Sequence, residues 1–519
     1  MSTSRDRAVV VAASIIVAAV TVALVALALL CGTQRVIGGD LWEHAAVVRA
    51  FARDPWSPAH PLLAISAPHA FFSPWLLAAG LLARAAHLDP FNALTVAGVV
   101  SVLALVSGQI VIVKCLATTT VQRAVGAVCL ISFSLLLWAE GGWQWSGFVH
   151  LRALLYTSAY PSTFAFGLSL WIVAAAAALT VTPSEASSWW RPRDIVRATG
   201  IVVGTATVWV THPTTAVSLS VFVLATVLGR LPTDRRAALV LMAQVGVCSA
   251  LGLVLALWWP YFSLLSLLRD GNSAEFSTVS GVLYKSVLTR MWPALVVGIP
   301  LLIVRAVRLK LRDPAVLATL GCLVVYVVAG VLEKDGLGRI IAWVVFGLHL
   351  TAALEVGEAC ARWWRASFIA IAIAAVALLA APMTLHAAAI AATAGRERPM
   401  WLIPSALRGV VGDDDVVLSD LGTSLSVPSH TGKIVASSHP LYWVPDHAAR
   451  RADVARFFKQ TTTKAQRLQI IDRWQVRWLF VDRARIKDIK VIEACAALGT
   501  VRSKGPRMIV DVGPQTRQR

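Results

Sequence analysis

The chain has 519 residues, of which 57% are hydrophobic and 14% charged, and its formal net charge is +19. A soluble domain carries about 25% charged residues, so this composition excludes an ordinary soluble protein. A charge of +19 would suggest a nucleic-acid-binding protein, but the Arg and Lys residues lie mostly in short loops between apolar runs. Anionic lipid headgroups and the positive-inside rule account for that placement. The expected partner is therefore the lipid bilayer and not nucleic acid.

The first apolar run extends from Ala8 to Leu30 and follows Arg5 and Arg7. It is too long for the hydrophobic region of a signal peptide, and no clear small-residue cleavage site follows it. We expect this run to be the first membrane-spanning helix, with the N-terminus in the cytoplasm.

Twelve apolar runs lie along the chain, most of them near the length that crosses a hydrocarbon core of about 30 Å. They lie near residues 8–30, 70–87, 93–114, 122–139, 161–181, 197–211, 214–229, 237–262, 291–305, 314–332, 338–357 and 366–386. If all twelve cross, basic loops face outward. If 70–87 instead lies along the outer interface or re-enters, every strongly basic loop faces the cytoplasm. The sequence therefore predicts about eleven spans, with the N-terminus inside and the C-terminus outside.

The last part of the chain changes character, with more charge and shorter apolar runs. Such runs predict strands at Val416–Leu418, Lys433–Val435, Trp478–Val481 and Met508–Val510. The segment Asp453–Trp474 is typical of helices. The predicted fold is an all-α polytopic membrane domain at residues 1–390, with juxtamembrane helices and a long first outer loop at 31–92. A small α/β extracytoplasmic domain follows at residues 391–519.

The most distinctive polar motif, Gly39-Asp40-Leu41-Trp42-Glu43-His44, follows the first span. Asp40, Glu43 and His44 have the i, i+3, i+4 spacing that puts side chains on one face of a helix. Charges beside the bilayer are costly unless they are paired or used, and a general base requires only one positioned carboxylate. We assign that role to Asp40. The alternative is that Asp40 caps the helix, with Glu43 completing a variant of the capping box.

The second outer loop holds four candidates for substrate binding. Trp143 and Trp145 have the ring surface that stacks on sugars, and His150 and Arg152 could hold a phosphate. The alternative for the tryptophans is the aromatic belt found at membrane interfaces.

Two further positions interrupt apolar runs. His212 lies between two predicted spans, where an ionisable residue is a functional candidate by default, or it forms a simple hairpin at the interface. Arg339 would lie at the outer end of a span, against the positive-inside trend, which suggests a phosphate ligand. The alternative for Arg339 is a salt bridge with Glu333 or Asp335.

Weaker candidates lie in the first outer loop and near the C-terminal strands. His60 and His69 could contact an anionic ligand or be ordinary interfacial residues. The run Asp413-Asp414-Asp415 lacks the spacing of a calcium-binding loop and is expected to be a solvated turn before a strand.

At these residues the chain resembles the GT-C glycosyltransferases, multispanning enzymes that use polyprenyl-phosphate sugars as donors on the outer face of the membrane. Gly39-Asp40-Leu41-Trp42-Glu43 is similar to the acidic motif after their first helix, and Arg339 to the basic residue near the lipid phosphate. The C-terminal segment also resembles their outer domains at Val417–Asp420, His430–Lys433, His439-Pro440 and Ile471–Val481.

The resemblance implies a glycosyltransferase of the bacterial plasma membrane that takes part in cell wall biogenesis. High Ala, Arg and Val content is typical of a GC-rich bacterium such as an actinobacterium. Asp40 would be the general base with Glu43 beside it. The substrate-binding residues would be His44, His60, Trp143, Trp145, His150, Arg152, His212 and Arg339.

The donor implied by the resemblance is a polyprenyl-phosphate-linked sugar, and the acceptor is an envelope glycan or lipid. No cofactor is expected, because a polyprenyl monophosphate leaving group need not require a metal. Two other readings stay open: a transporter or flippase for a lipid or polysaccharide, and a non-catalytic scaffold of envelope assembly.

Overall fold

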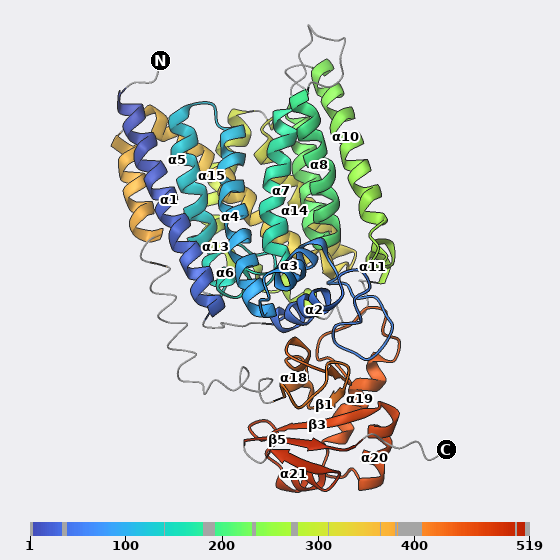
Figure 1. The fold of residues 1–519 in the computed structure, drawn as a ribbon. Helices are drawn as coiled ribbons and strands as arrows, with labels where there is room; N and C mark the ends of the chain where they lie inside the picture. Colours follow the sequence, from blue (N-terminus) through green and yellow to red (C-terminus); the bar gives the residue numbers. More distant parts are fainter. Residues whose placement is uncertain are drawn as a thin grey trace. The chain divides into compact units, whose positions relative to one another are not determined.

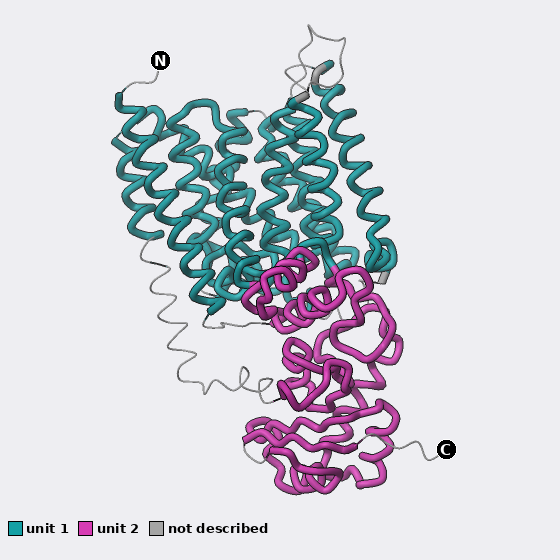
Figure 2. The backbone as a smooth tube through the Cα atoms, viewed as in Figure 1, with its two compact units in different colours: residues 1–36, 73–75, 95–389 teal, residues 37–72, 76–94, 390–519 magenta. Residues whose placement is uncertain are grey.

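The computed structural model of the chain describes residues 4–33, 39–139, 141–179, 192–230, 235–270, 279–309, 311–363, 365–378, 381, 407–503 and 506–513. The chain forms two compact units (Figure 2). Unit 1 comprises residues 1–36, 73–75 and 95–389, and unit 2 comprises residues 37–72, 76–94 and 390–519. Most of the segment predicted to be the first outer loop thus belongs to the same unit as the C-terminal segment. A boundary near residue 390 stays a prediction, because residues 382–406 lie outside the described ranges.

Unit 1 is a bundle of helices (Figure 1). Among the described residues, seven helices are long and apolar enough to cross a membrane, by length and composition. These are α1 (Ser4–Thr33), α4 (Pro90–Leu116), α7 (Pro161–Ala178), α10 (Arg235–Leu257), α13 (Val287–Arg308), α14 (Pro314–Val331) and α15 (Ile341–Arg362). The other long helices are α5 (Thr120–Leu136), α8 (Pro192–Thr211), α9 (Pro213–Leu228) and Arg365–Leu378. Every run expected to span forms a helix, but the count of eleven spans is not confirmed.

The run at 70–87, expected not to cross, forms the short helix α3 (Pro74–Ala85) of 12 residues. At about 1.5 Å per residue such a helix is roughly 18 Å long, well short of a hydrocarbon core of about 30 Å. Its length is therefore that of a juxtamembrane helix. The connections between the long helices contain α6 (Leu151–Thr157), α11 (Leu264–Asp270), η2 (Gly281–Tyr284) and η3 (Asp335–Ile340).

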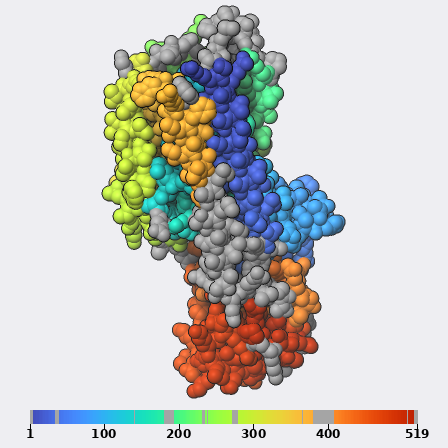
Figure 3. Space-filling model, turned by 90° about the vertical axis from the view of Figure 1, so that its left-hand side faces the viewer, coloured from blue at the N-terminus to red at the C-terminus, as the bar shows by residue number. Residues whose placement is uncertain are grey.

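Small residues let the helices of unit 1 approach closely. A Cβ added to Gly167 of α7 would lie 2.6 Å from the backbone of Ala104 in α4, and one added to Gly108 would lie 2.8 Å from the Gly167 carbonyl oxygen. Close contact at small residues is a usual source of helix association in membranes. α15 is buried over most of its length and packs against α5, α13 and α14. Figures 1 and 3 both show the helix Arg365–Leu378 beside α1.

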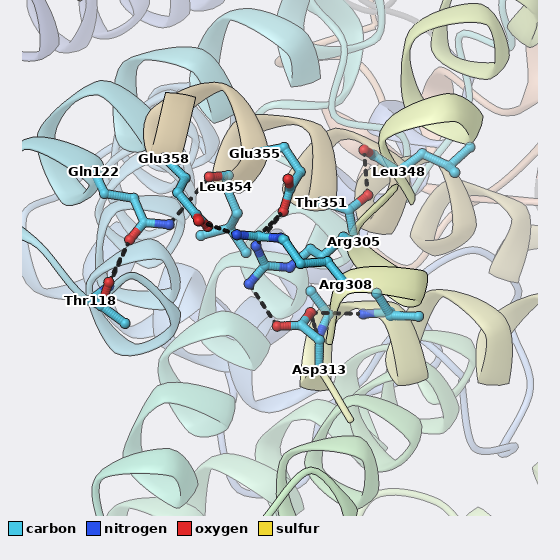
Figure 4. A network of polar contacts seen from close by, with 12 residues as sticks. Thr118, Gln122, Arg305, Arg308, Asp313, Leu348, Thr351, Leu354, Glu355 and Glu358 are labelled. Carbon is cyan, nitrogen blue, oxygen red and sulfur yellow. Dashed lines mark hydrogen bonds and ion pairs between the residues drawn. The ribbon is translucent and has the colours of Figure 1, made fainter. Parts of the chain in front are cut away.

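A network of charged side chains joins the ends of α13, α14 and α15 (Figure 4). Arg305 is 3% exposed and donates to Asp313 Oδ2 at 2.6 Å and to Glu355 Oε1 at 2.8 Å. Arg308 donates to Glu355 at 2.6 Å and also to Glu358. A buried charge is tolerated when it is paired in this way. Part of the basic charge that the sequence assigns to lipid contacts is thus balanced inside the protein.

Unit 2 contains a five-stranded sheet with strand order β2-β1-β3-β5-β4. The strands are β1 (Val416–Leu418), β2 (Lys433–Ile434), β3 (Val476–Asp482), β4 (Thr500–Ser503) and β5 (Arg507–Asp511). β1 pairs in parallel with β2 and β3, whereas β5 is antiparallel to β3 and β4. The four predicted strands are confirmed. The edge strand β4 was not predicted, because it has no apolar run and is nowhere fully buried.

Helices cover this sheet and supply the rest of its core. They are α18 (Leu421–Ser424), η4 (Val427–Ser429), α19 (His447–Phe457), α20 (Lys464–Arg473) and α21 (Ile489–Ala496). Leu418, Phe457 and Leu479 are completely buried in one apolar cluster. The C-terminal segment is therefore a small α/β fold, as expected.

Candidate functional site

The acidic motif forms the head of α2 (Leu41–Arg53) in unit 2. Gly39 has φ +45°, in the left-handed region that glycine adopts without Cβ strain, and Asp40 follows at the N-cap position. Within the described residues, the Asp40 side chain makes no hydrogen bond to the helix backbone. Its side chain is 36% exposed, whereas that of Glu43 is 4% exposed and turns toward two histidines. Helix capping therefore does not account for this acidic pair.

Both oxygens of Glu43 accept hydrogen bonds from histidines. His69 Nε2 lies 3.1 Å from Oε1, and His439 Nδ1 lies 3.1 Å from Oε2. The Phe71 backbone N–H donates to His69 Nδ1, so His69 carries its proton on Nε2 and donates it to Glu43. Burial alone would raise the pKa of Glu43, but the two hydrogen bonds and the histidine charges outweigh it and lower the pKa to about 2. Glu43 is therefore held ionised.

His439 brings the C-terminal segment of unit 2 to the acidic pair. Its Nδ1 lies 3.1 Å from Glu43 Oε2 and 3.4 Å from Asp40 Oδ1. Burial would lower the pKa of His439, but the hydrogen bond to Glu43 and the charges of both carboxylates raise it above its ordinary value. The arrangement thus sets a histidine that is more readily protonated than a free imidazole beside a partly exposed carboxylate.

The other two histidines predicted for this site are buried. His44 is 2% exposed and its ring meets Phe71 edge-on at 4.7 Å; burial lowers the pKa of His44 to about 4. His60 is 2% exposed, and its Nδ1 accepts from the Leu62 and Leu63 backbone N–H groups at 3.2 and 3.0 Å. Burial lowers the pKa of His60 well below its ordinary value. Both imidazoles therefore favour the neutral form, which lacks the charge that attracts an anion.

Backbone and side-chain bonds tie the first outer loop to the C-terminal sheet inside unit 2. The Ile434 backbone N–H at the β2 edge donates to the Leu62 carbonyl at 2.8 Å, and Lys433 Nζ donates to the His60 carbonyl at 2.6 Å. These bonds fix the loop that carries His69 against the strand that precedes His439.

Two arginines of α2 add ion pairs to the same connection. Arg49 lies 2.7 Å from Asp413 Oδ1, and Arg53 lies 2.9 Å from Asp414 Oδ2. Asp415 accepts from the Trp478 indole N–H at 2.8 Å. The three aspartates are therefore partners of protein cations and of an indole, and the expectation of a simple solvated turn was incomplete.

The residues predicted in the second outer loop lie in unit 1 and serve mainly to pack it. Trp143 is 2% exposed, and the Arg290 guanidinium lies 5.3 Å from its ring centroid. His150 Nε2 donates to the Trp143 carbonyl at 2.7 Å, and its Nδ1 accepts from the Ala153 N–H. Burial lowers the pKa of His150 to about 4, so it favours the neutral form. The burial of Trp143 favours packing over sugar stacking.

The remaining candidates of unit 1 differ in exposure. Trp145 is half-buried against the helix core, and Arg152 lies one residue into α6. His212 is the N-cap of α9, where its Nδ1 accepts from the Thr215 N–H at 3.3 Å, so its plain role is to start that helix. Arg339 in η3 is half-buried, and its positive charge is close enough to repel a proton on His212.

Arg339 is a half-buried arginine of unit 1. In the described part of the chain it forms no ion pair, and Glu333 and Asp335 are not its partners. The salt-bridge alternative with Glu333 or Asp335 therefore finds no support among the described residues, and binding of an anion by Arg339 stays a prediction.

The candidate residues thus fall into two groups, one in each unit: Asp40, Glu43, His44 and His60 in unit 2, and the others in unit 1. Across the described ranges, no group of three or more His, Cys, Asp or Glu side chains is arranged to hold a metal ion. The expectation that no cofactor is needed stays a prediction.

Sequence reasoning missed His439 and Arg290, and the role of His69 as a partner of Glu43. The available signal was that a carboxylate on the buried face of a helix requires a cationic or donating partner. The sequence does not say which of its 11 histidines supplies it.

No protein-family model and no curated protein matches the chain by sequence. Among solved structures, the chain is similar to the oligosaccharyltransferase of Archaeoglobus fulgidus in its apo form, with a TM-score of 0.53 and 11% identity. The similarity covers 90% of this chain and 69% of that chain. At this identity the comparison shows the fold alone. The chain thus shares the fold of that structure over most of its length, and the resemblance to the GT-C glycosyltransferases stays a prediction.

Proposed function

We propose that this chain is an integral membrane glycosyltransferase that transfers a sugar from a polyprenyl-phosphate donor to a glycan or lipid acceptor of the bacterial cell envelope. The observation that carries the proposal is the similarity of fold to an oligosaccharyltransferase over 90% of the chain. The acidic pair at the head of α2 adds a reactive group to that fold, since Asp40 is the one member of the pair with an exposed carboxylate.

In the proposed reaction the acceptor hydroxyl attacks the anomeric carbon of the donor sugar. The bond between that carbon and the phosphate oxygen breaks, and the polyprenyl phosphate leaves with the electron pair. Asp40 takes the proton of the hydroxyl, and a positioned base of this kind contributes about 100- to 10,000-fold. Arg339 is the residue we assign to the donor phosphate, because it carries no ion pair within the described residues and phosphate binding favours arginine.

The test is sugar transfer in isolated membranes from a panel of polyprenyl-phosphate donors that differ in the sugar. The wild type is compared with Asp40→Asn and with the matched control Asp472→Asn, an exposed aspartate on α20. Wild-type transfer that is lost in Asp40→Asn and kept in Asp472→Asn supports the proposal and names the donor.

Arg339→Ala should weaken donor binding and raise KM for the donor, whereas Arg312→Ala at an exposed position should not. Failure of the wild type to use any donor would contradict the proposal and favour a transporter or a scaffold. Equal transfer by wild type and Asp40→Asn would remove Asp40 from the mechanism.

A further inference from the structure

His439 occupies a place between the two carboxylates of the acidic motif. It lies 396 positions after Glu43 in the sequence, and a single nitrogen, Nδ1, faces both Glu43 Oε2 at 3.1 Å and Asp40 Oδ1 at 3.4 Å. An ionised carboxylate only accepts hydrogen bonds, so Nδ1 must carry a proton, which it donates to Glu43 Oε2, while Asp40 Oδ1 lies within ion-pair distance. The geometry therefore fixes which nitrogen of His439 is protonated.

We infer that His439 is a positioning residue, which holds the carboxylate of Asp40 in its reactive orientation, and that Glu43 acts through His439 and not as a second base. This inference rests on the proposed function. It assigns a role in the site to the C-terminal segment, which supplies the histidine.

Glu43 is unsuited to direct proton transfer because both of its oxygens are occupied. His69 donates to Oε1, and its own tautomer is fixed by the Phe71 N–H on Nδ1. At 4% exposure the Glu43 side chain offers almost no surface to an acceptor hydroxyl. Its rigid carboxylate is instead well placed to fix His439.

Asp40 has the opposite character and needs such support. Its side chain is 36% exposed at the N-cap position of α2 and, within the described residues, makes no capping bond that would restrict its rotation. One contact from His439 to Oδ1 orients the carboxylate and leaves Oδ2 for the acceptor. A misplacement of about 1 Å in a reacting group can cost about 100-fold in rate.

The charged and titratable groups around His439 are Asp40 and Glu43 on α2, His44 on the same helix, and His69 beyond Glu43. The two carboxylates outweigh the opposing effects of burial, and so the pKa of His439 is raised. The ion pair with Asp40 is present while His439 is protonated and weakens as the pH rises through that raised pKa. Turnover should therefore fall on the alkaline side of its optimum.

The experiment measures kcat and KM against pH for the full chain in detergent or lipid, with the donor that the wild type uses. His439→Ala should lower kcat by about 100-fold with little change in KM. His439→Asn keeps a neutral donor near the position of Nδ1, so it should retain more activity than His439→Ala and lose the alkaline fall. The matched control is His87→Asn, at an exposed histidine with φ +51° that asparagine tolerates.

Suppose that wild-type turnover depends on Asp40 but that His439→Ala has the same kcat and pH profile as His87→Asn. That result would overturn the inference and leave the proposed function intact. A wild type without turnover would instead contradict the proposed function. A readout independent of turnover is the pKa of His439, followed by NMR of the chain with 15N-labelled histidine. Asp40→Asn and Glu43→Gln should each lower it, and an unchanged value in both would refute the contact.

Discussion

The carboxylate of Glu43 accepts from two histidines at a position where its side chain is only 4% exposed. Replacing Glu43 with alanine removes both bonds and leaves His69 Nε2–H and His439 Nδ1–H without their acceptor. Breaking a buried charged pair costs about 3–5 kcal/mol. One kcal/mol shifts the melting temperature of a folded unit of about 150–250 residues by about 2–4 °C. Glu43→Ala should therefore lower the melting temperature of unit 2 by about 6–20 °C.

Glu43→Gln is a milder substitution at the same position and should lower the melting temperature less than Glu43→Ala. The amide oxygen still accepts from His69, but the amide NH2 meets the donor of His439, so about one charge-assisted bond is lost, worth about 1.5–3 kcal/mol. The assay is the tryptophan fluorescence of the purified full chain during heating. The matched controls are Glu493→Ala and Glu493→Gln, at an exposed glutamate of α21. A Glu43→Ala variant that melts within about 2 °C of its control would refute the reasoning.

Arg305→Ala should destabilise unit 1 by about 3–5 kcal/mol, because it leaves the buried carboxylate of Asp313 without its ion-pair partner. Arg362→Ala, with a side chain 69% exposed, should change little, and thermal melts of both variants check this. Glu43 has a lowered folded pKa of about 2, so its stabilisation is complete above about pH 5 and is lost as the pH falls toward about 2. The difference in melting temperature between wild type and Glu43→Gln should therefore shrink in that window, and a constant difference would contradict the assignment. Gly80→Val should destabilise unit 2 by about 1–3 kcal/mol, because a Cβ there would lie 2.4 Å from the Phe51 Cβ, and an unchanged melting temperature would show that α3 is not held against α2.

Helices and strands could be predicted wherever the sequence has a clear apolar run of the matching length. Each long apolar run forms a helix, and the four short runs after Val416 form strands. β4 was missed because its side chains alternate between exposed and half-buried, and such an edge strand depends on pairing with β5 and not on an apolar pattern. The number of spans is not settled by length and composition, which single out seven helices among the described residues.

The candidate site could be located from the sequence but not completed. The motif spacing places Asp40 and Glu43 at the start of one helix, as observed. It does not reveal that Glu43 is buried under histidines from two distant segments, because such contacts depend on how the C-terminal segment folds against α2. His44 lies on the helix where expected, yet its ring packs on Phe71. Spacing alone does not show whether a residue on that face has a polar or an apolar neighbour.

Outer-loop aromatic and basic residues were the hardest to interpret. Trp143 in such a loop fits either a sugar-binding surface or the interior, and only its 2% exposure separates the two. Arg339 was ambiguous between an ion pair and a ligand contact, because the sequence does not show whether Glu333 or Asp335 reaches it.

The most direct test of the central claim is single-turnover transfer of a labelled sugar from its polyprenyl-phosphate donor by the purified chain, with wild type and Asp40→Asn compared at equal folding. The account predicts that the variant binds donor as the wild type does and transfers about 100- to 10,000-fold more slowly. Transfer by Asp40→Asn at the wild-type rate would contradict the account.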